Sequence, residues 1–206
     1  DFWLIDPIDG TKDYIKKKDE YTLNAALIIN LNPALGVVYA PAKDRLFYSY
    51  GKDKAFEISN GKKSILNGRK IKTNEIIALI NSDKTPDEVL EIYKKNKVSK
   101  LIKMSSSLKF CALAAGEADI YAAKARAYEW DIAAGHTILD HSGGSVTTLD
   151  GNNFLYGKIL IIDTGTYSQR LEQICNFQKI NTKKIFSIKK INWKKICSVN
   201  TKFDWI

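Results

Sequence analysis

Residues 1–14 read DFWLIDPIDGTKDY, and this stretch decides how the chain is interpreted. The apolar run Phe2–Ile5 is typical of a buried strand. It leads into Asp6-Pro7-Ile8-Asp9-Gly10-Thr11, where proline and glycine predict a sharp turn. Like charges a few ångströms apart raise each other's pKa unless a cation lies between them. Asp6 and Asp9 therefore predict a bound cation where the first strand ends.

The composition is that of an ordinary globular protein. The chain has 206 residues, of which 45% are hydrophobic and 11% aromatic. This length suits one domain, or one domain and part of another. No apolar run approaches the roughly 20 residues of a membrane-spanning helix, and the start lacks the features of a signal peptide. A start on aspartate, inside an expected core strand, indicates an N-terminally truncated fragment.

The net charge of +9 comes from scattered lysines. They are not interleaved with aromatic residues in a repeated pattern, so we expect no nucleic-acid partner. A solvated surface, or a general attraction for a small anionic ligand, explains the charge better. The three cysteines are far apart without metal-ligand spacing, which indicates free thiols in a reducing cytoplasm. Peripheral attachment to the inner face of the plasma membrane and a homodimer both stay open.

The order of the expected elements favours a layered α/β (α+β) fold. The first half consists mostly of expected strands, at 21–30, 35–40, 45–50, 55–59 and 62–66. Asn60-Gly61 joins the last two as a type I′ hairpin turn. The second half alternates strands with helices: strands at 76–80, 100–104 and 120–123, and helices with Thr85 as N-cap, with Ser105-Ser106 as cap, and with Asp131 near the N-cap.

The texture of the chain changes near residue 157. From residue 158 onward the sequence is rich in Ile, Asn and Lys, and its helical and strand periods are poor. We therefore assign residues 1–157 to one domain and residues 158–206 to a divergent C-terminal segment.

Three aspartates form the candidate metal site. Asp6 and Asp9 flank the first turn, so the Ile8 carbonyl faces the same space, and Asp131 follows Trp130 at a helix start. Oxygen ligands of this kind suit Mg²⁺. The alternative is that Asp6 and Asp9 are turn residues and Asp131 an ordinary helix cap. Taken singly, each aspartate is better explained by this alternative. Taken together in their full sequence motifs, the three aspartates are better explained by a metal site.

Gly10-Thr11 supplies the second half of the candidate site. If Thr11 begins a helix, the amides of Gly10 and Thr11 face an anion, and the positive end of the helix favours phosphate. Carboxylates for a metal beside amides for a phosphate are typical of a metal-assisted phosphatase.

The string WLIDPIDGTKDYI (residues 3–15) resembles the first signature of the inositol monophosphatase superfamily of magnesium-dependent phosphatases. EWDIAAGHTILDHSGG (residues 129–144) resembles the second. DGTKDYI and SSSLKFCALAAGEADIY (residues 105–121) are similar to the bacterial 3′(2′),5′-bisphosphate nucleotidase branch. The resemblance covers roughly residues 1–157, and it implies a layered α-β-α-β-α sandwich with its N-terminal portion missing.

The resemblance implies a role for each matching residue. The first metal would be held by Asp6, the Ile8 carbonyl and Asp9, and a second metal by Asp131. Gly10 and Thr11 would hold the scissile phosphate, with Thr11 and Asp9 serving the attack of water. Ser106 and Lys109 would lie near the nucleotide, although a helix cap for Ser106 and a solvated Lys109 are equally good readings.

The implied reaction is Mg²⁺-dependent hydrolysis of the 3′-phosphate of 3′-phosphoadenosine 5′-phosphate, giving AMP and phosphate. An inositol or sugar monophosphatase of the same superfamily is the alternative. An inactive phosphate-binding fragment is another, since the resemblance also implies an N-terminal glutamate pair that this chain lacks.

Two further features set this chain apart. The nucleotidase branch usually has an arginine two residues after the tyrosine of its D-x-Y strand. Here Ala122-Ala123-Lys124 follows Tyr121, so Lys124 or Arg126 is the candidate replacement. His136 and His141 lie on one expected helix without a metal-binding pattern, and packing or surface roles are expected for both.

Overall fold

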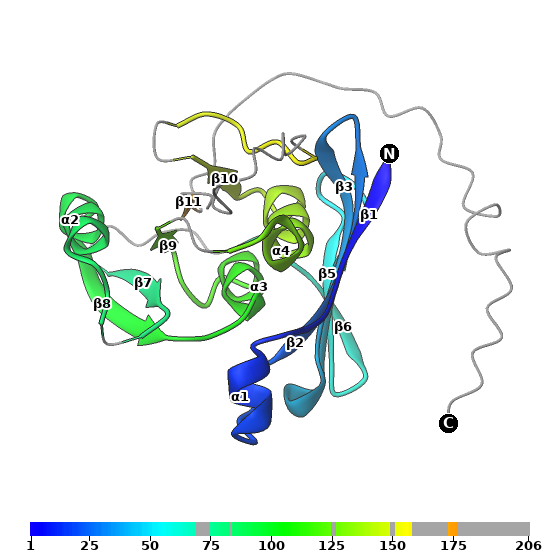
Figure 1. The fold of residues 1–206 in the computed structure, drawn as a ribbon, viewed down its shortest axis with the longest axis horizontal. Helices are drawn as coiled ribbons and strands as arrows, with labels where there is room; N and C mark the ends of the chain where they lie inside the picture. Colours follow the sequence, from blue (N-terminus) through cyan, green and yellow to red (C-terminus); the bar gives the residue numbers. More distant parts are fainter. Residues whose placement is uncertain (69–74, 83, 125–126, 149–150, 158–172, 177–206) are drawn as a thin grey trace, which may run out of the picture.

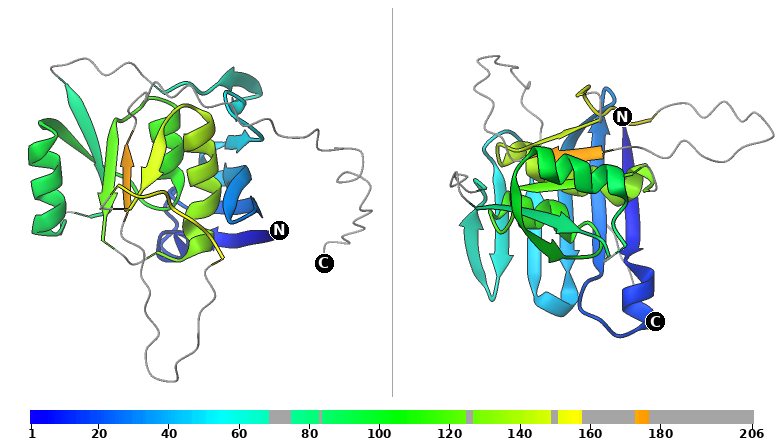
Figure 2. Two further views of the ribbon diagram at one scale, coloured as in Figure 1. Left: turned by 90° about the horizontal axis from the view of Figure 1, so that it is seen from above. Right: turned by 90° about the vertical axis from the view of Figure 1, so that its left-hand side faces the viewer.

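The computed structural model describes residues 1–68, 75–82, 84–124, 127–148 and 151–157, and the backbone of 173–176 (Figure 1). Two sheets enclose a pair of helices, and a further helix lies on the outer side of the second sheet. Figure 2 shows these layers in two more directions. The predicted α/β class is therefore confirmed.

The first sheet has six antiparallel strands, in the order in which they occur along the chain. They are β1 (Phe2–Asp9), β2 (Thr22–Ile29), β3 (Asn32–Ala40), β4 (Arg45–Ser49), β5 (Ala55–Ser59) and β6 (Lys62–Ile65). A 3₁₀ turn (Pro41–Lys43) joins β3 to β4. Asn60 and Gly61 have φ angles of 49° and 71°, which confirms the expected I′ hairpin between β5 and β6.

Strand β1 is not a buried strand, contrary to the prediction for Phe2–Ile5. It lies at the edge of the sheet and pairs with β2 alone among the described strands. Trp3 is 48% exposed and Ile5 63% exposed, whereas their neighbours in the strand are more covered. Both side chains therefore lie on the outer face of the sheet. The described residues place no helix on that face, so they form four of the five predicted layers.

The second sheet has five strands in the order β10-β11-β9-β7-β8. They are β7 (Ile76–Ile80), β8 (Val98–Lys103), β9 (Ile120–Ala123), β10 (Ser145–Thr147) and β11 (Gln173–Asn176). β7 runs parallel to both β8 and β9, and β11 is antiparallel to β9 and β10. A strand thus forms in part of the segment whose periodicity is poor. The rest of residues 158–206 lies outside the described residues, and the domain boundary at 157 stays a prediction.

The helices are α1 (Thr11–Ile15), α2 (Asp87–Lys95), α3 (Leu108–Ala114) and α4 (Glu129–His141). α3 and α4 lie between the sheets, and α2 covers the other face of the second sheet through Val89 and Tyr93 (Figures 1 and 2). α2 begins one residue later than expected, because Pro86 rather than Thr85 is its N-cap. No helix among the described ranges is long and apolar enough to cross a membrane.

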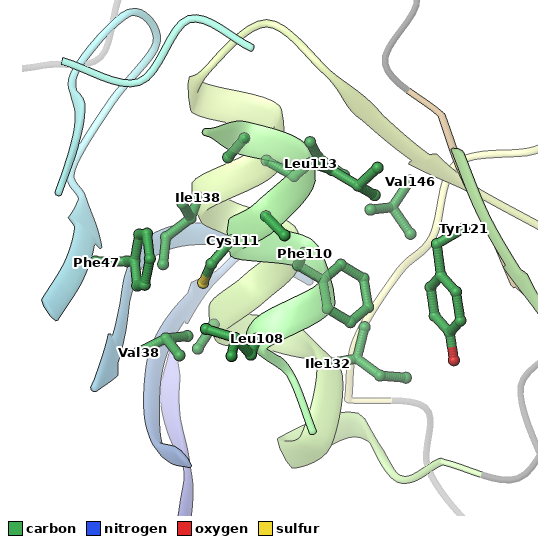
Figure 3. Close-up of a cluster of buried hydrophobic side chains, with 14 of the residues drawn as sticks. Val38, Phe47, Leu108, Phe110, Cys111, Leu113, Tyr121, Ile132, Ile138 and Val146 are labelled. Atoms are coloured by element: carbon green, nitrogen blue, oxygen red, sulfur yellow. The ribbon is translucent and has the colours of Figure 1, made fainter. Parts of the chain in front are cut away.

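The main core lies around α3 and α4. Figure 3 shows Val38 and Phe47 of the first sheet facing α3, with Tyr121 and Val146 of the second sheet on the opposite side. Packing is close: a Cβ added at Gly135 of α4 would lie 2.7 Å from the Phe110 side chain. Burial raises the pKa of the free Cys111 thiol, which suits packing rather than reactivity.

Both histidines have packing roles, which is one of the two kinds of role expected for them. His136 is buried, and its Nδ1 lies 2.7 Å from the hydroxyl of Tyr156. His141 Nδ1 accepts a hydrogen bond from the Gly51 amide at 3.1 Å. Burial lowers the pKa of His141 to about 4, so its ring is neutral near pH 7.

Candidate active site

The structure brings Asp6, Asp9 and Asp131 together. One carboxylate oxygen from each lies within 4.8 Å of the others. Two of the three come from the end of β1 and the third from the first turn of α4. Asp131, which lies 122 positions after Asp9 in the chain, therefore joins Asp6 and Asp9 in one acidic cluster at the edge of the first sheet.

A bulge in β1 explains why Asp6 and Asp9 can act together. Asp6 pairs with Asn24 and Asp9 with Thr22, so β1 contains one extra residue between these pairs. In a regular strand, residues three apart would point to opposite faces. The extra residue brings both carboxylates to the same side. The predicted sharp turn is thus a bulged continuation of the strand, and Ile8 N–H donates to Asp6 Oδ1 at 3.0 Å.

Asp131 is the third residue of α4 and lies near its N-cap, Tyr128, as expected. Its Oδ2 accepts a hydrogen bond from the backbone N–H of Tyr128 at 2.8 Å. This bond belongs to a capping box, which stabilises the start of the helix. Asp131 therefore caps the helix with one oxygen and faces Asp6 and Asp9 as part of the cluster.

The electrostatics of the cluster favour a bound cation. Burial, together with the carboxylates of Asp9 and Asp6, raises the pKa of Asp131 to about 6, against the hydrogen bond from Tyr128, which lowers it. Burial also raises the pKa of Asp9, while the positive charge of Lys109 lowers it. A divalent cation between the oxygens would relieve this repulsion. A set of carboxylate oxygens fits Mg²⁺, which prefers hard ligands.

The turn after Asp9 is shaped by Gly10. Its φ of 85° lies in the left-handed region, and an added Cβ would be 2.9 Å from the carbonyl oxygen of Glu20. Both features require glycine. α1 begins at Thr11 as expected, and the Thr11 hydroxyl donates to the Ile8 carbonyl at 3.1 Å. The Ile8 carbonyl, expected as a metal ligand, is thus next to the hydroxyl expected to orient water.

A cavity of about 460 Å³ opens beside the cluster and gathers most of the predicted site residues. Among the predicted residues, the lining contains Asp9, Gly10, Thr11, Ser106, Lys109 and Asp131. Lys12 and Lys124 add positive charge to the lining, and the rings of Phe110 and Tyr121 add apolar surface. The cavity therefore joins an acidic region to a basic one.

Lys109 is buried, so the reading of it as a solvated lysine is wrong. Its Nζ donates to the Ser106 carbonyl and lies 5.2 Å from the centre of the Tyr121 ring. Ser106 has a φ of 54°, an uncommon backbone conformation for a residue other than glycine. Its Oγ accepts a hydrogen bond from Leu108 N–H at 3.3 Å, although Ser107 is the N-cap of α3. Strained backbone of this kind often marks functional sites.

Sequence reasoning missed a buried polar group beneath Asp9. Thr22, Asn24 and Ser107 are all buried, and the Ser107 hydroxyl is hydrogen bonded to the side chains of the other two. The signal was present in β2, where Thr22 and Asn24 occupy inward positions that Ala26 and Ile28 continue as apolar ones. Asn81, whose Nδ2 donates to the Tyr121 hydroxyl at 2.7 Å across the cavity lining, was also missed.

Comparisons with known proteins show the family to which the chain belongs. The model of the inositol monophosphatase family matches residues 1–182. A Buchnera aphidicola protein named 3′(2′),5′-bisphosphate nucleotidase CysQ is 40% identical over 82% of this chain and 64% of its own length. Its Salmonella typhimurium namesake is 36% identical over 75% of this chain and 62% of its own length. The chain thus spans under two thirds of these curated relatives.

A solved structure gives the same result. CysQ from Bacteroides thetaiotaomicron, described as a bacterial member of the inositol monophosphatase family, superimposes with a TM-score of 0.72 at 29% identity. The match covers 85% of this chain and 69% of that one. The layered arrangement of sheets and helices is therefore shared with a solved member of that family.

Proposed function

The chain belongs to the inositol monophosphatase family, and from that premise we propose that its protein is a Mg²⁺-dependent phosphatase. The proposed reaction removes the 3′-phosphate of 3′-phosphoadenosine 5′-phosphate and gives AMP and phosphate. One observation carries the proposal: a single cavity joins the carboxylates of Asp9 and Asp131 to the ammonium groups of Lys109 and Lys124.

The acidic region would hold the metal. Asp6, Asp9 and Asp131 would bind Mg²⁺ through their carboxylates, together with the Ile8 carbonyl. Bound Mg²⁺ lowers the pKa of a water molecule and stabilises the leaving oxygen. Gly10 and Thr11 would hold the scissile phosphate, and the Thr11 hydroxyl, already hydrogen bonded to the Ile8 carbonyl, would orient the attacking water.

The basic region favours a substrate with two anionic groups. Ser106 and Lys109 would contact the nucleotide, and Lys124 carries positive charge into the same lining. Lys124 directly follows Ala123, the position at which the nucleotidase branch usually has arginine. Lys124 Nζ now lies 2.6 Å from Glu88 Oε1 on α2, and both side chains are exposed, so a phosphate could displace this weak surface pair.

The alternatives differ in what they require of the basic region. An inositol or sugar monophosphatase needs the acidic cluster but gains nothing from Lys124. An inactive phosphate-binding protein needs the lysines but no turnover. The names of the curated relatives, at 36–40% identity, support the nucleotidase proposal. A cytoplasmic location and a homodimer stay predictions, and the comparisons give no support for peripheral membrane attachment.

The test is phosphate release in Mg²⁺ and in EDTA from 3′-phosphoadenosine 5′-phosphate and from inositol 1-phosphate. We expect a higher kcat/KM for the bisphosphate and no turnover in EDTA. Lys124→Ala should lower kcat/KM for the bisphosphate about 10-fold, the effect of one charged hydrogen bond. Lys124→Ala should leave kcat/KM for inositol 1-phosphate unchanged. The control Lys94→Ala, on the exposed surface of α2, should leave kcat/KM unchanged as well.

Each other outcome selects an alternative. An equal or reversed preference would remove the nucleotidase assignment and leave a monophosphatase. Binding of phosphate without hydrolysis in Mg²⁺ would favour the phosphate-binding alternative.

A further inference from the structure

We infer that Ser107 is a positioning residue which, with Thr22 and Asn24 of β2, fixes the Asp9 carboxylate and the first turn of α3 in one arrangement. This inference rests on the proposed function, because it concerns how Asp9 is presented to the metal. We call these three side chains the Ser107 network. None of them lines the cavity except Ser107 itself.

Ser107 makes its hydrogen bonds through two separate groups, its backbone N–H and its side-chain hydroxyl. The backbone N–H of Ser107 donates to Asp9 Oδ2 at 2.5 Å. The Ser107 hydroxyl donates to Asn24 Oδ1 at 2.7 Å and lies 2.9 Å from the hydroxyl of Thr22. A hydroxyl has a single proton, so Thr22 must be the donor to Ser107. The hydrogen bonds therefore run in one direction, from Thr22 through Ser107 to Asn24.

The network determines how Asp9 can bind a cation. The backbone N–H of Ser107 occupies one Asp9 oxygen and so limits the orientations that this carboxylate can take. The Gly10 backbone N–H also donates to this carboxylate, and one Asp9 oxygen lies within 4.8 Å of carboxylate oxygens of Asp6 and Asp131. Hydrogen bonds to a ligating carboxylate commonly set its orientation and affinity. If Ser107 moved, Asp9 would be free to rotate and the three carboxylates would lose their common geometry.

The network also links the two regions of the cavity. Ser107 lies between Ser106 and Lys109 in the chain, at the start of α3, and its hydroxyl bonds to β2. The same residue therefore holds the proposed nucleotide contacts and the proposed metal ligand in register. Buried polar groups cost stability unless they are hydrogen bonded, and β2 carries them only at the end beside the site.

Asn24 adds an independent observation. Its Nδ2 is buried and has no hydrogen-bond partner among the described residues. Asn24 stands opposite Asp6 in the pairing of β1 with β2. An acceptor bound at the acidic cluster, such as a water molecule on the metal, would complete the hydrogen bonding of this amide. The network is thus incomplete in a way that a ligand at the cluster would correct.

The experiment measures Mg²⁺ affinity by isothermal titration, and thermal unfolding in EDTA, for the 206-residue chain and four variants. Ser107→Ala removes the central hydroxyl, and Thr22→Val removes one hydroxyl at nearly constant shape. Thr22→Ser retains the hydroxyl. Ser49→Ala is the matched control, because Ser49 is also a buried serine but its Oγ has no partner among the described residues.

We expect Ser107→Ala to weaken Mg²⁺ binding about 10- to 100-fold, the usual effect of losing a group that orients a metal ligand. Thr22→Val should weaken it several-fold, and Thr22→Ser and Ser49→Ala should match the wild type. If Ser107→Ala does not fold, the difference in Mg²⁺ affinity between Thr22→Val and Thr22→Ser tests the inference.

Unchanged Mg²⁺ affinity in Ser107→Ala and Thr22→Val, even with lowered thermal stability, would overturn the inference and show a structural role alone. The proposed function would then still stand. A wild-type chain that binds no Mg²⁺ would instead overturn the metal site of the proposed function, and the inference with it.

Discussion

Replacing Asp131 by asparagine removes one charge from the acidic cluster and leaves the shape of the side chain nearly unchanged. The amide oxygen of asparagine can still accept the hydrogen bond that Asp131 Oδ2 receives from Tyr128 N–H at 2.8 Å. The capping box of α4 therefore survives on that side. Asp131→Asn tests the charge of residue 131 separately from its helix-capping role.

The metal-free variant should be more stable than the wild type. Burial and the carboxylates of Asp9 and Asp6 raise the pKa of Asp131 from 3.8 to about 6. Such a rise corresponds to about 3 kcal/mol of unfavourable free energy at neutral pH. Because Asp131 is only partly buried, solvent screening reduces the expected gain in Asp131→Asn to about 1–2 kcal/mol.

The pH dependence follows from the same values. Between pH 3.8 and about 6 the folded chain holds the Asp131 proton more tightly than the unfolded chain does. Stability of the metal-free wild type should therefore fall as pH rises through this window and become level above it. The Asp131→Asn variant should lack this component of the fall. Burial raises the pKa of Asp9 as well, so a smaller fall should remain in the variant.

In Mg²⁺ the wild type should become more stable than Asp131→Asn. At a concentration 100-fold above its Kd, a ligand that binds only the folded state adds about 2.7 kcal/mol. The wild type should gain stability of this order, while Asp131→Asn should gain little because one ligand is lost. Phosphate release in Mg²⁺ should fall at least about 100-fold in the variant.

The assay is urea unfolding followed by circular dichroism from pH 4 to pH 8, in EDTA and in Mg²⁺. Asp87→Asn is the control, because Asp87 is an exposed aspartate in the first turn of α2, away from the acidic cluster. The Asp87→Asn variant should be a few tenths of a kcal/mol less stable than the wild type at every pH above about 5, because it loses a favourable interaction with the helix dipole. An Asp131→Asn variant less stable than the wild type in EDTA would refute the repulsion argument. Near wild-type turnover at saturating Mg²⁺ would show that Asp131 is only a helix cap.

Three further predictions concern single residues. Gly10→Ala should lower the free energy of unfolding in urea by about 1–3 kcal/mol, since φ is 85° and the new Cβ would lie 2.9 Å from Glu20 O; a neutral result would mean that the turn can relax. Gly135→Ala should lower it by a similar ~1–3 kcal/mol through overpacking, because its Cβ would lie 2.7 Å from Phe110, and a gain in stability would contradict the close packing of α3 on α4. Lys109→Met should retain the buried stem of the side chain but lower kcat/KM for the bisphosphate at least ~10-fold, and phosphate release equal to that of Lys94→Ala would exclude Lys109 from substrate binding.

Local patterns predicted the elements that depend on neighbouring residues. The I′ turn at Asn60-Gly61 was predictable because the dipeptide itself favours positive φ angles. The strand expected at 21–30 likewise forms, as β2. These features are encoded within a few residues, so no knowledge of the tertiary structure was needed.

The features that were missed depend on residues far apart in the chain. The edge position of β1 follows from strand order, which Phe2–Ile5 cannot reveal. The hydrogen bond from Ser107 to Asp9 joins residues 98 positions apart. β11 forms in a segment of poor periodicity because β9 and β10 flank it on both sides. The aspartates were recognisable from their motifs, whereas the polar network beneath them was not.

The most direct measurement is anomalous diffraction from crystals of the protein soaked in Mn²⁺, which substitutes for Mg²⁺ at oxygen sites. We predict an anomalous peak about 2.1 Å from carboxylate oxygens of Asp6, Asp9 and Asp131, the distance typical of such hard cations. The peak should be absent from Asp131→Asn crystals or much reduced. A fully occupied Mn²⁺ site elsewhere, with no peak at these carboxylates, would contradict the account.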